Sequence, residues 1–165
     1  MMNLSNQQDY LANSTAAIKR LSRTIMLAGG EFSLILACCN SVKTQQQILN
    51  SLKEFSSADI QEIMLSPSAE TLYTTIKNTI GDSRPEALVV KGLESVAAIN
   101  QLLLSTNLMR DEFRKNCHFT LVLWVNDEIL SKLVWLAPDF KNWAASTIRF
   151  DIAHQHFIES PALSA

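Results

Sequence analysis

Residues 32–52 read FSLILACCNSVKTQQQILNSL, and this stretch contains the pattern that decides the fold. It opens with a continuous apolar run at residues 32–36, which is typical of a strand buried on both faces of a parallel sheet. It closes with apolar residues at helical spacing, which predict an amphipathic helix from about residue 44 to residue 54. A buried strand that leads into a helix indicates an α/β fold.

The same alternation continues along the chain. Further strands are predicted at residues 60–65, 87–90, 119–125 and 148–152. Helices are predicted from a cap at Asn13, Ser14 or Thr15 to Gly29, and then at about residues 69–80 and 94–113. A last helix is predicted from a cap at Asn126 or Asp127 to the Ala137-Pro138 break. Only the last strand alternates polar and apolar residues, so we expect it at an edge of the sheet, with residues 32–36 central.

The connection after the first strand, ACCNSVKT at residues 37–44, has the length and ending of the motif G-x-x-x-x-G-K-[ST]. Ala37 and Val42 occupy the two glycine positions, whereas Lys43 and Thr44 remain. Glycines let this loop cradle phosphate with its N–H groups, and a left-handed Val42 costs about 1–2 kcal/mol. The alternative interpretation is a plain capping box, Thr44-x-x-Gln47, with Lys43 in solvent.

The end of the third strand carries a second departure. P-loop enzymes place a magnesium-binding aspartate there, but Lys91 stands at this position and would repel a metal ion. Glu94 is a possible relic of a catalytic acid, or an ordinary acidic residue in the first turn of a helix. Asn126, Asp127 and Glu128 follow the fourth strand, where they either sense a nucleotide or begin the next helix.

Three stretches carry a family resemblance: residues 32–49, residues 87–95 (ALVVKGLES) and residues 121–145 (LVLWVNDEILSKLVWLAPDFKNWAA). Together they resemble a degenerate P-loop NTPase-like domain of the signal-transduction (STAND, NACHT-like) ATPase group, of the kind found in large multidomain cyanobacterial-type proteins. The resemblance implies a three-layer α/β/α fold with a mainly parallel five-stranded sheet in the order 5-1-4-3-2. It covers residues 13–152, between a flexible N-terminus (1–12) and a tail or linker (153–165).

The resemblance also implies what has been lost, because its departures fall on the residues that make such domains ATPases. The predicted function is a non-catalytic protein-interaction or regulatory module, with no catalytic residues and no cofactor. The alternative is a nucleotide-binding domain with weak or residual ATPase activity. That alternative would use the relic loop, namely Asn40, Ser41, Lys43 and Thr44.

Two other groups of residues merit a hypothesis. Trp135, Phe140 and Trp143 surround the Ala137-Pro138 break. Either they cap the core at an edge of the domain, or at least one ring faces a protein partner or a second copy. The adjacent thiols of Cys38 and Cys39 would suit a redox sensor or a buried inert pair. Cys117-His118 with His154 and His156 does not have the spacing of a zinc site, so no metal is predicted.

Composition and charge limit the partners and the cellular compartment that we expect for this protein. The 165 residues carry a net charge of -2, which gives no reason to expect nucleic acid or an anionic membrane as partner. Three cysteines do not form a disulfide framework, and neither a signal peptide nor a membrane-spanning run is visible. We therefore expect a cytoplasmic domain.

Overall fold

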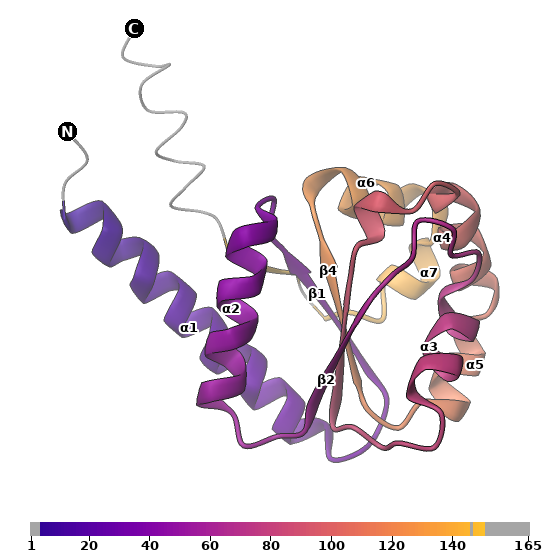
Figure 1. The fold of residues 1–165 in the computed structure, drawn as a ribbon, viewed down its shortest axis with the longest axis horizontal. Helices are drawn as coiled ribbons and strands as arrows, with labels where there is room; N and C mark the ends of the chain where they lie inside the picture. Colours follow the sequence, from indigo (N-terminus) through magenta and orange to yellow (C-terminus); the bar gives the residue numbers. More distant parts are fainter. Residues whose placement is uncertain (1–3, 146, 151–165) are drawn as a thin grey trace, which may run out of the picture.

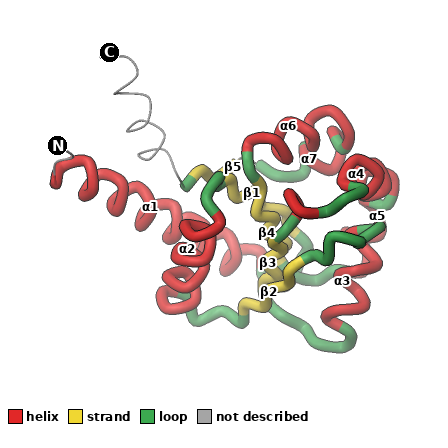
Figure 2. Tube along the Cα trace, turned by 45° about the horizontal axis from the view of Figure 1, so that its top comes forward, coloured by secondary structure: helices red, strands yellow, loops and turns green. Residues whose placement is uncertain are grey.

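The computed structural model describes the backbone of residues 4–145 and 147–150, and side chains from residue 15 onward within these ranges. Its centre is a parallel sheet of five strands in the order β2-β3-β4-β1-β5. The strands are β1 (Ser33–Cys38), β2 (Ile60–Met64), β3 (Ala87–Lys91), β4 (Thr120–Val125) and β5 (Thr147–Arg149). Figure 2 shows them stacked in this sequence. The predicted order 5-1-4-3-2 is confirmed.

The strand positions follow from how apolar each strand is. β1 pairs with β4 on one side and β5 on the other, so it is an inner strand, and β4 is the middle one. β5 lies at an edge, with Ile148 buried and Arg149 exposed, as its alternating sequence predicts. Residues 151 and 152, which were also assigned to this strand, lie outside the described residues.

Helices cover both faces of the sheet, which confirms the three-layer α/β/α architecture (Figure 1). One face carries α1 (Leu4–Ala28) and α2 (Val42–Phe55). The other face carries α3 (Leu72–Ile80), the 3-10 turn η1 (Leu93–Ser95), α4 (Ile99–Leu108), α5 (Arg110–Asn116), α6 (Asp127–Leu136) and α7 (Pro138–Lys141).

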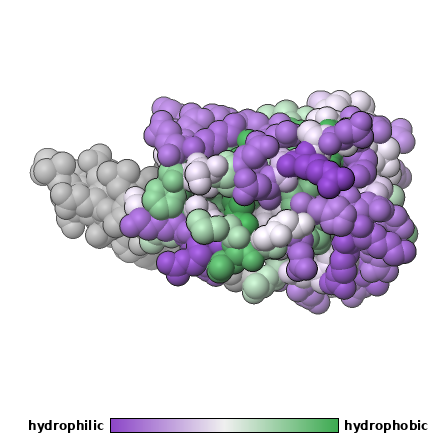
Figure 3. All heavy atoms as spheres, turned by 90° about the horizontal axis from the view of Figure 1, so that it is seen from below, coloured by the Kyte–Doolittle hydropathy of each residue, from purple (hydrophilic) through white to green (hydrophobic). Residues whose placement is uncertain are grey.

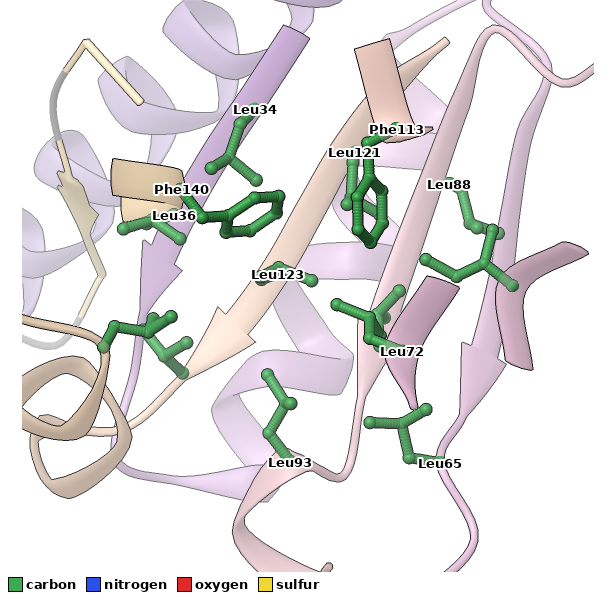
Figure 4. Close-up of a cluster of buried hydrophobic side chains, with 14 of the residues drawn as sticks. Leu34, Leu36, Leu65, Leu72, Leu88, Leu93, Phe113, Leu121, Leu123 and Phe140 are labelled. Atoms are coloured by element: carbon green, nitrogen blue, oxygen red, sulfur yellow. The ribbon is translucent and has the colours of Figure 1, made fainter. Parts of the chain in front are cut away.

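Each face of the sheet has its own apolar core. The larger core lies under α3–α7, where strand leucines meet the rings of Phe113 and Phe140 (Figure 4). The smaller core lies under α1 and α2, and Trp124 packs edge-on against Phe150 within it. Because both faces are covered, strand side chains are buried whichever way they point, which explains why β1, β3 and β4 are mostly apolar.

Two predicted helices differ from the observed ones. α1 begins at Leu4, so the predicted caps Asn13, Ser14 and Thr15 lie inside the helix. No glycine or proline interrupts residues 4–28, so nothing forces a later start. The predicted helix 94–113 is three elements, η1, α4 and α5, with breaks before Ile99 and at Met109. Apolar spacing does not reveal these breaks, because Leu102, Leu103 and Phe113 all reach the same core.

On the face seen from below, hydrophilic residues predominate, and hydrophobic residues appear in separate places among them (Figure 3). Within the described part of the chain, no helix combines the length and the apolarity needed to cross a lipid bilayer.

Candidate functional site

The topology indicates where a binding site would lie, namely along the edge of the sheet formed by the carboxyl ends of its strands. β1 and β4 are neighbours, but the helices that follow them, α2 and α6, pack on opposite faces (Figure 1). In open α/β sheets, ligands bind outside the carboxyl ends of strands at such a point. The candidate site is therefore formed by residues 39–41 after β1 and residues 126–127 after β4, which we call the switch-point edge.

The connection between β1 and α2 is much shorter than the sequence predicts. Ala37 and Cys38 continue the strand, paired with Trp124 and Val125 of β4, and Val42 already begins α2. Only residues 39–41 remain as a loop, instead of the eight residues of the predicted connection. Among the described residues, only glycines have a positive φ, so Val42 is not held in a left-handed conformation. It sits at the start of the helix with 63% of its surface exposed.

The backbone donors at the two ends of this connection are engaged. The Cys39 N–H donates to the Val125 carbonyl at 2.9 Å, and the Thr44 N–H donates to Ser41 Oγ at 3.2 Å. Ser41, rather than Thr44, is thus the N-cap of α2. The buried Gln45 amide donates to the Cys39 carbonyl at 2.9 Å and ties the loop to the helix. Lys43 points into solvent on the first turn, and Thr44 is half-buried.

Asn40 and Asp127 join the two sides of the switch-point edge. Asn40 Nδ2 donates to Asp127 Oδ2, and the Asp127 N–H donates back to Asn40 Oδ1, both at 2.9 Å. Arg149, from β5, donates to Asp127 Oδ1 at 3.0 Å. The Arg149 guanidinium, followed by the Asn40 amide, holds the pKa of Asp127 below its usual value. The edge is therefore closed by contacts among the protein's own side chains.

The sequence identified part of this network. It placed Asn40 in the relic loop and Asp127 after the fourth strand, but did not assign Arg149 to the site. The available signal was that all three residues follow or end parallel strands, whose carboxyl ends meet at one edge.

The cysteines do not form a redox pair in this arrangement. Cys38 belongs to the core under α3–α7 and Cys39 to the core under α1 and α2, so the adjacent thiols point to opposite faces. Cys38 Sγ lies 3.5 Å from both Asp127 Oδ1 and Arg149 Nη1. Burial raises the pKa of Cys117 to about 11, so this thiol stays protonated. His154 and His156 lie outside the described residues.

Lys91 is the last residue of β3 and faces α2. Its ammonium donates to Glu62 Oε1 of β2 at 2.7 Å and to Gln46 Oε1 of α2 at 3.1 Å. Lys53 also pairs with Glu62, and the two hydrogen-bonded lysines, Lys53 first, lower the pKa of that carboxyl. A cation therefore stands where the P-loop resemblance implies a metal-binding aspartate.

Glu94 does not join these groups. It is exposed in η1, which packs against β4 and α6 on the opposite face from α2. The geometry is that of an acidic residue in a short helical turn, with no contact to Lys43 or Lys91 among the hydrogen bonds and ion pairs of the described residues.

The three predicted interaction rings occupy different environments. Phe140 is fully buried against Phe113, with ring centroids 5.2 Å apart. Trp143 is half-buried against Phe32 and Phe140, and the Arg114 guanidinium lies 4.2 Å from its ring centre. Trp135, on α6, has 81% of its surface exposed. Of the three, Trp135 is the ring available to a partner.

Comparison with protein-family models and with curated protein sequences gave no match. The function has therefore to be argued from the contacts at the switch-point edge and from the exposed surface.

Proposed function

We propose that this chain is a P-loop NTPase-like domain without nucleotide chemistry, which acts in the cytoplasm as a protein-interaction or regulatory module. One observation carries the proposal: the connection between β1 and α2 is only three residues long, and the Asn40 side chain within it is bound to Asp127. A phosphate cradle is built from consecutive N–H groups of a loop. Here the N–H groups of Cys39 and Thr44, on either side of residues 40–43, already donate to Val125 and Ser41.

Charge supports the same proposal. The side chains that could bind a phosphate here, the Asn40 amide and the Arg149 guanidinium, already bind the Asp127 carboxylate. On the metal side, the ion pair between Lys91 and Glu62 replaces a magnesium ligand with a cation. Both features oppose the binding of MgATP.

An interaction role is supported by the apolar surface on the opposite side of the sheet from α2. Trp135 and Leu108 are each more than four-fifths exposed, on α6 and α4 respectively. Tryptophan is among the residues that contribute most to binding at protein interfaces. A domain that uses its surface keeps the scaffold without needing the chemistry.

The test is a titration of the purified chain with a fluorescent adenine nucleotide, with and without magnesium. We expect no saturable binding up to about 1 mM nucleotide, and no phosphate release above a blank. The matched variant is Lys43→Ala, which should behave like the wild type.

The competing function is nucleotide binding through Lys43, Thr44 and the positive end of α2. A micromolar affinity that disappears in Lys43→Ala would establish it and overturn the proposal.

A further inference from the structure

Strand β2 is the last strand on one side of the sheet, and no described strand pairs with its outer side (Figure 2). It pairs with β3 over all five of its residues in an unbroken parallel register. Proteins commonly protect such an edge with a proline, a bulge or a charged side chain. β2 contains neither a proline nor a bulge. Its one charged side chain, Glu62, is bound by Lys53 of α2 and Lys91 of β3.

The hydrogen bonds to β3 show which backbone groups of β2 face inward. The Ala87 N–H donates to the Asp59 carbonyl at 3.2 Å, and the Leu65 N–H donates to the Lys91 carbonyl at 2.9 Å. Successive residues of a strand direct their N–H and C=O groups to opposite sides, so every second residue from 59 to 65 faces β3.

The N–H and C=O groups of the residues between them, Ile60, Glu62 and Met64, therefore point away from the sheet. We call these three residues the β2 edge. No hydrogen bond within the described part of the chain engages their backbone groups. The unpaired groups recur at every second residue, about 7 Å apart. Another extended polypeptide has the same backbone repeat, so the partner that fits this edge is a β-strand.

The side chains of the β2 edge lie on the face of the sheet that α2 covers. Glu62 pairs with Lys53 of α2, and Ile60 packs on the core under α1 and α2. Met64 lies on the same face by alternation and has 63% of its surface exposed. Two lysine charges, from Lys53 and Lys91, against the one carboxylate leave a net charge of +1 between two apolar side chains.

We infer that the β2 edge binds an extended segment of another protein, which presents an acidic side chain between two apolar ones to the α2 face. The acidic side chain offsets the excess of lysine charge, and the apolar ones pack beside Ile60 and Met64. Asp59 and Glu86 do not offset this charge, because they alternate onto the face of α3. A second copy is a poorer partner, since a two-fold contact at β2 brings the same net positive group close to itself.

The inference rests on the proposed function only in that the domain acts through protein contacts. The probe is the acetylated and amidated heptapeptide Ser-Val-Thr-Glu-Thr-Val-Ser, whose valines and glutamate share one face of a strand. The peptide is added to the isotope-labelled full chain, and hydrogen exchange of each backbone amide is followed by NMR. We expect a Kd on the order of 1 mM.

The exchange pattern identifies strand addition. In the free chain the Gln61 and Ile63 amides should exchange slowly and the Glu62 and Met64 amides quickly, because only the first two face β3. Peptide at about ten times its Kd should slow exchange of the Glu62 and Met64 amides about tenfold, because only the free chain exchanges there. A peptide with lysine in place of glutamate should bind at least about fivefold more weakly.

Two variants at position 64 separate the backbone from the side chain. Met64→Pro removes one outward N–H and leaves the hydrogen bonds to β3 intact, so it should weaken peptide binding at least about tenfold. Met64→Thr loses the same side chain but keeps the N–H, and should bind within about threefold of the wild type. Slow exchange of the Gln61 and Ile63 amides checks that each variant is folded. The wild-type pattern tests the inference even where Met64→Pro does not fold.

Three results would overturn the inference. The first is unchanged exchange at Glu62 and Met64 with about 10 mM peptide. The second is equal binding of the glutamate and lysine peptides. The third is protection of these two amides as the concentration of the chain alone rises, which would make a second copy the partner. In each case the proposed loss of nucleotide chemistry would stand. Micromolar MgATP binding would refute that loss, whatever the exchange pattern.

Discussion

Gly92 follows β3 with a φ of 89°, and a Cβ added there would lie 2.6 Å from Met64 Sδ and 3.3 Å from the backbone N and O of Leu65. The Met64 side chain can move aside. The Leu65 backbone cannot do so easily, because it lies where the ends of β2 and β3 approach each other closely. We expect Gly92→Ala to lower the free energy of unfolding by about 2–3 kcal/mol, measured in urea, of which about 1–2 kcal/mol is the left-handed backbone. Gly30→Ala is the control, because Gly30 has a φ of 86° and open space around it. Equal losses in the two variants would show that the contact with Leu65 costs nothing.

The Glu62 carboxylate, held by Lys53 and Lys91, predicts a dependence of stability on pH. Its folded pKa lies below the unfolded value, so its contribution is present above the unfolded pKa and is lost as the pH falls through the folded one. Glu62→Gln should therefore cost about 1 kcal/mol at pH 7, and this cost should shrink as the pH falls below the unfolded pKa, by urea unfolding at each pH. The control is Glu54→Gln, which removes an exposed carboxylate of α2 and should cost less than about 0.5 kcal/mol at pH 7. A constant difference between wild type and Glu62→Gln at every pH would contradict the ion pair.

At the scale of single elements, the start of α2 tests which residue caps the helix. One interpretation of the sequence makes Thr44 the capping residue, but in the structure Ser41 Oγ accepts from the Thr44 N–H. Ser41→Ala should therefore cost about 1 kcal/mol in thermal or urea unfolding, because it leaves an N–H of the first turn without its acceptor. Thr44→Ala should cost clearly less. The reverse ranking would restore the predicted capping box.

Trp143 and Trp135 should contribute differently to stability, because the Trp143 ring is packed against other side chains and the Trp135 ring is exposed. Trp143→Ala removes the contacts with Phe32, Phe140 and Arg114, and should cost about 2–4 kcal/mol in urea unfolding. Trp135→Ala removes an exposed ring, and should change the stability of the monomer by less than about 0.5 kcal/mol. A larger loss in Trp135→Ala would place that ring in the core.

The sequence predicted strands better than helix ends. Inner parallel strands are covered on both faces, so each produces an unbroken apolar run that is visible without a structure. Small residues fit either a strand or a turn, so the sequence alone places Ala37 and Cys38 in the loop. Only their pairing with Trp124 and Val125 shows that they belong to β1. The break at Met109 leaves no signal in the spacing of apolar residues.

The candidate site was less accessible to prediction for a related reason. Asn40, Asp127 and Arg149 are 22 to 109 positions apart, and they meet only because β1 has β4 and β5 as neighbours. Strand order follows from the fold class, whereas the choice of hydrogen-bond partner depends on side-chain rotamers that no local pattern specifies. The departures from the P-loop motif at Val42 and Lys91 can each be recognised in the sequence. The hydrogen-bond network of Asn40, Asp127 and Arg149 cannot.

At the scale of the whole molecule, the sheet needs a helical layer on each face, and α1 supplies part of the thinner one. Its buried residues among the described side chains are Ile18, Leu21, Ser22 and Ile25. The three apolar ones pack with Ile148 and Phe150 in the core under α1 and α2. Leu21→Ala should therefore cost about 2–5 kcal/mol in urea unfolding.

A chain without residues 1–12 should keep the wild-type stability within about 1 kcal/mol, because Asn13, Ser14 and Thr15 would then cap the shortened helix. Stability carried by residues 13–152 would agree with the predicted start of the domain. A deletion that unfolds the chain would instead show that the first turns of α1 are part of the fold. In that case the cover on this face would begin earlier than the apolar pattern of α1 indicates, and Leu21→Ala would understate what α1 contributes.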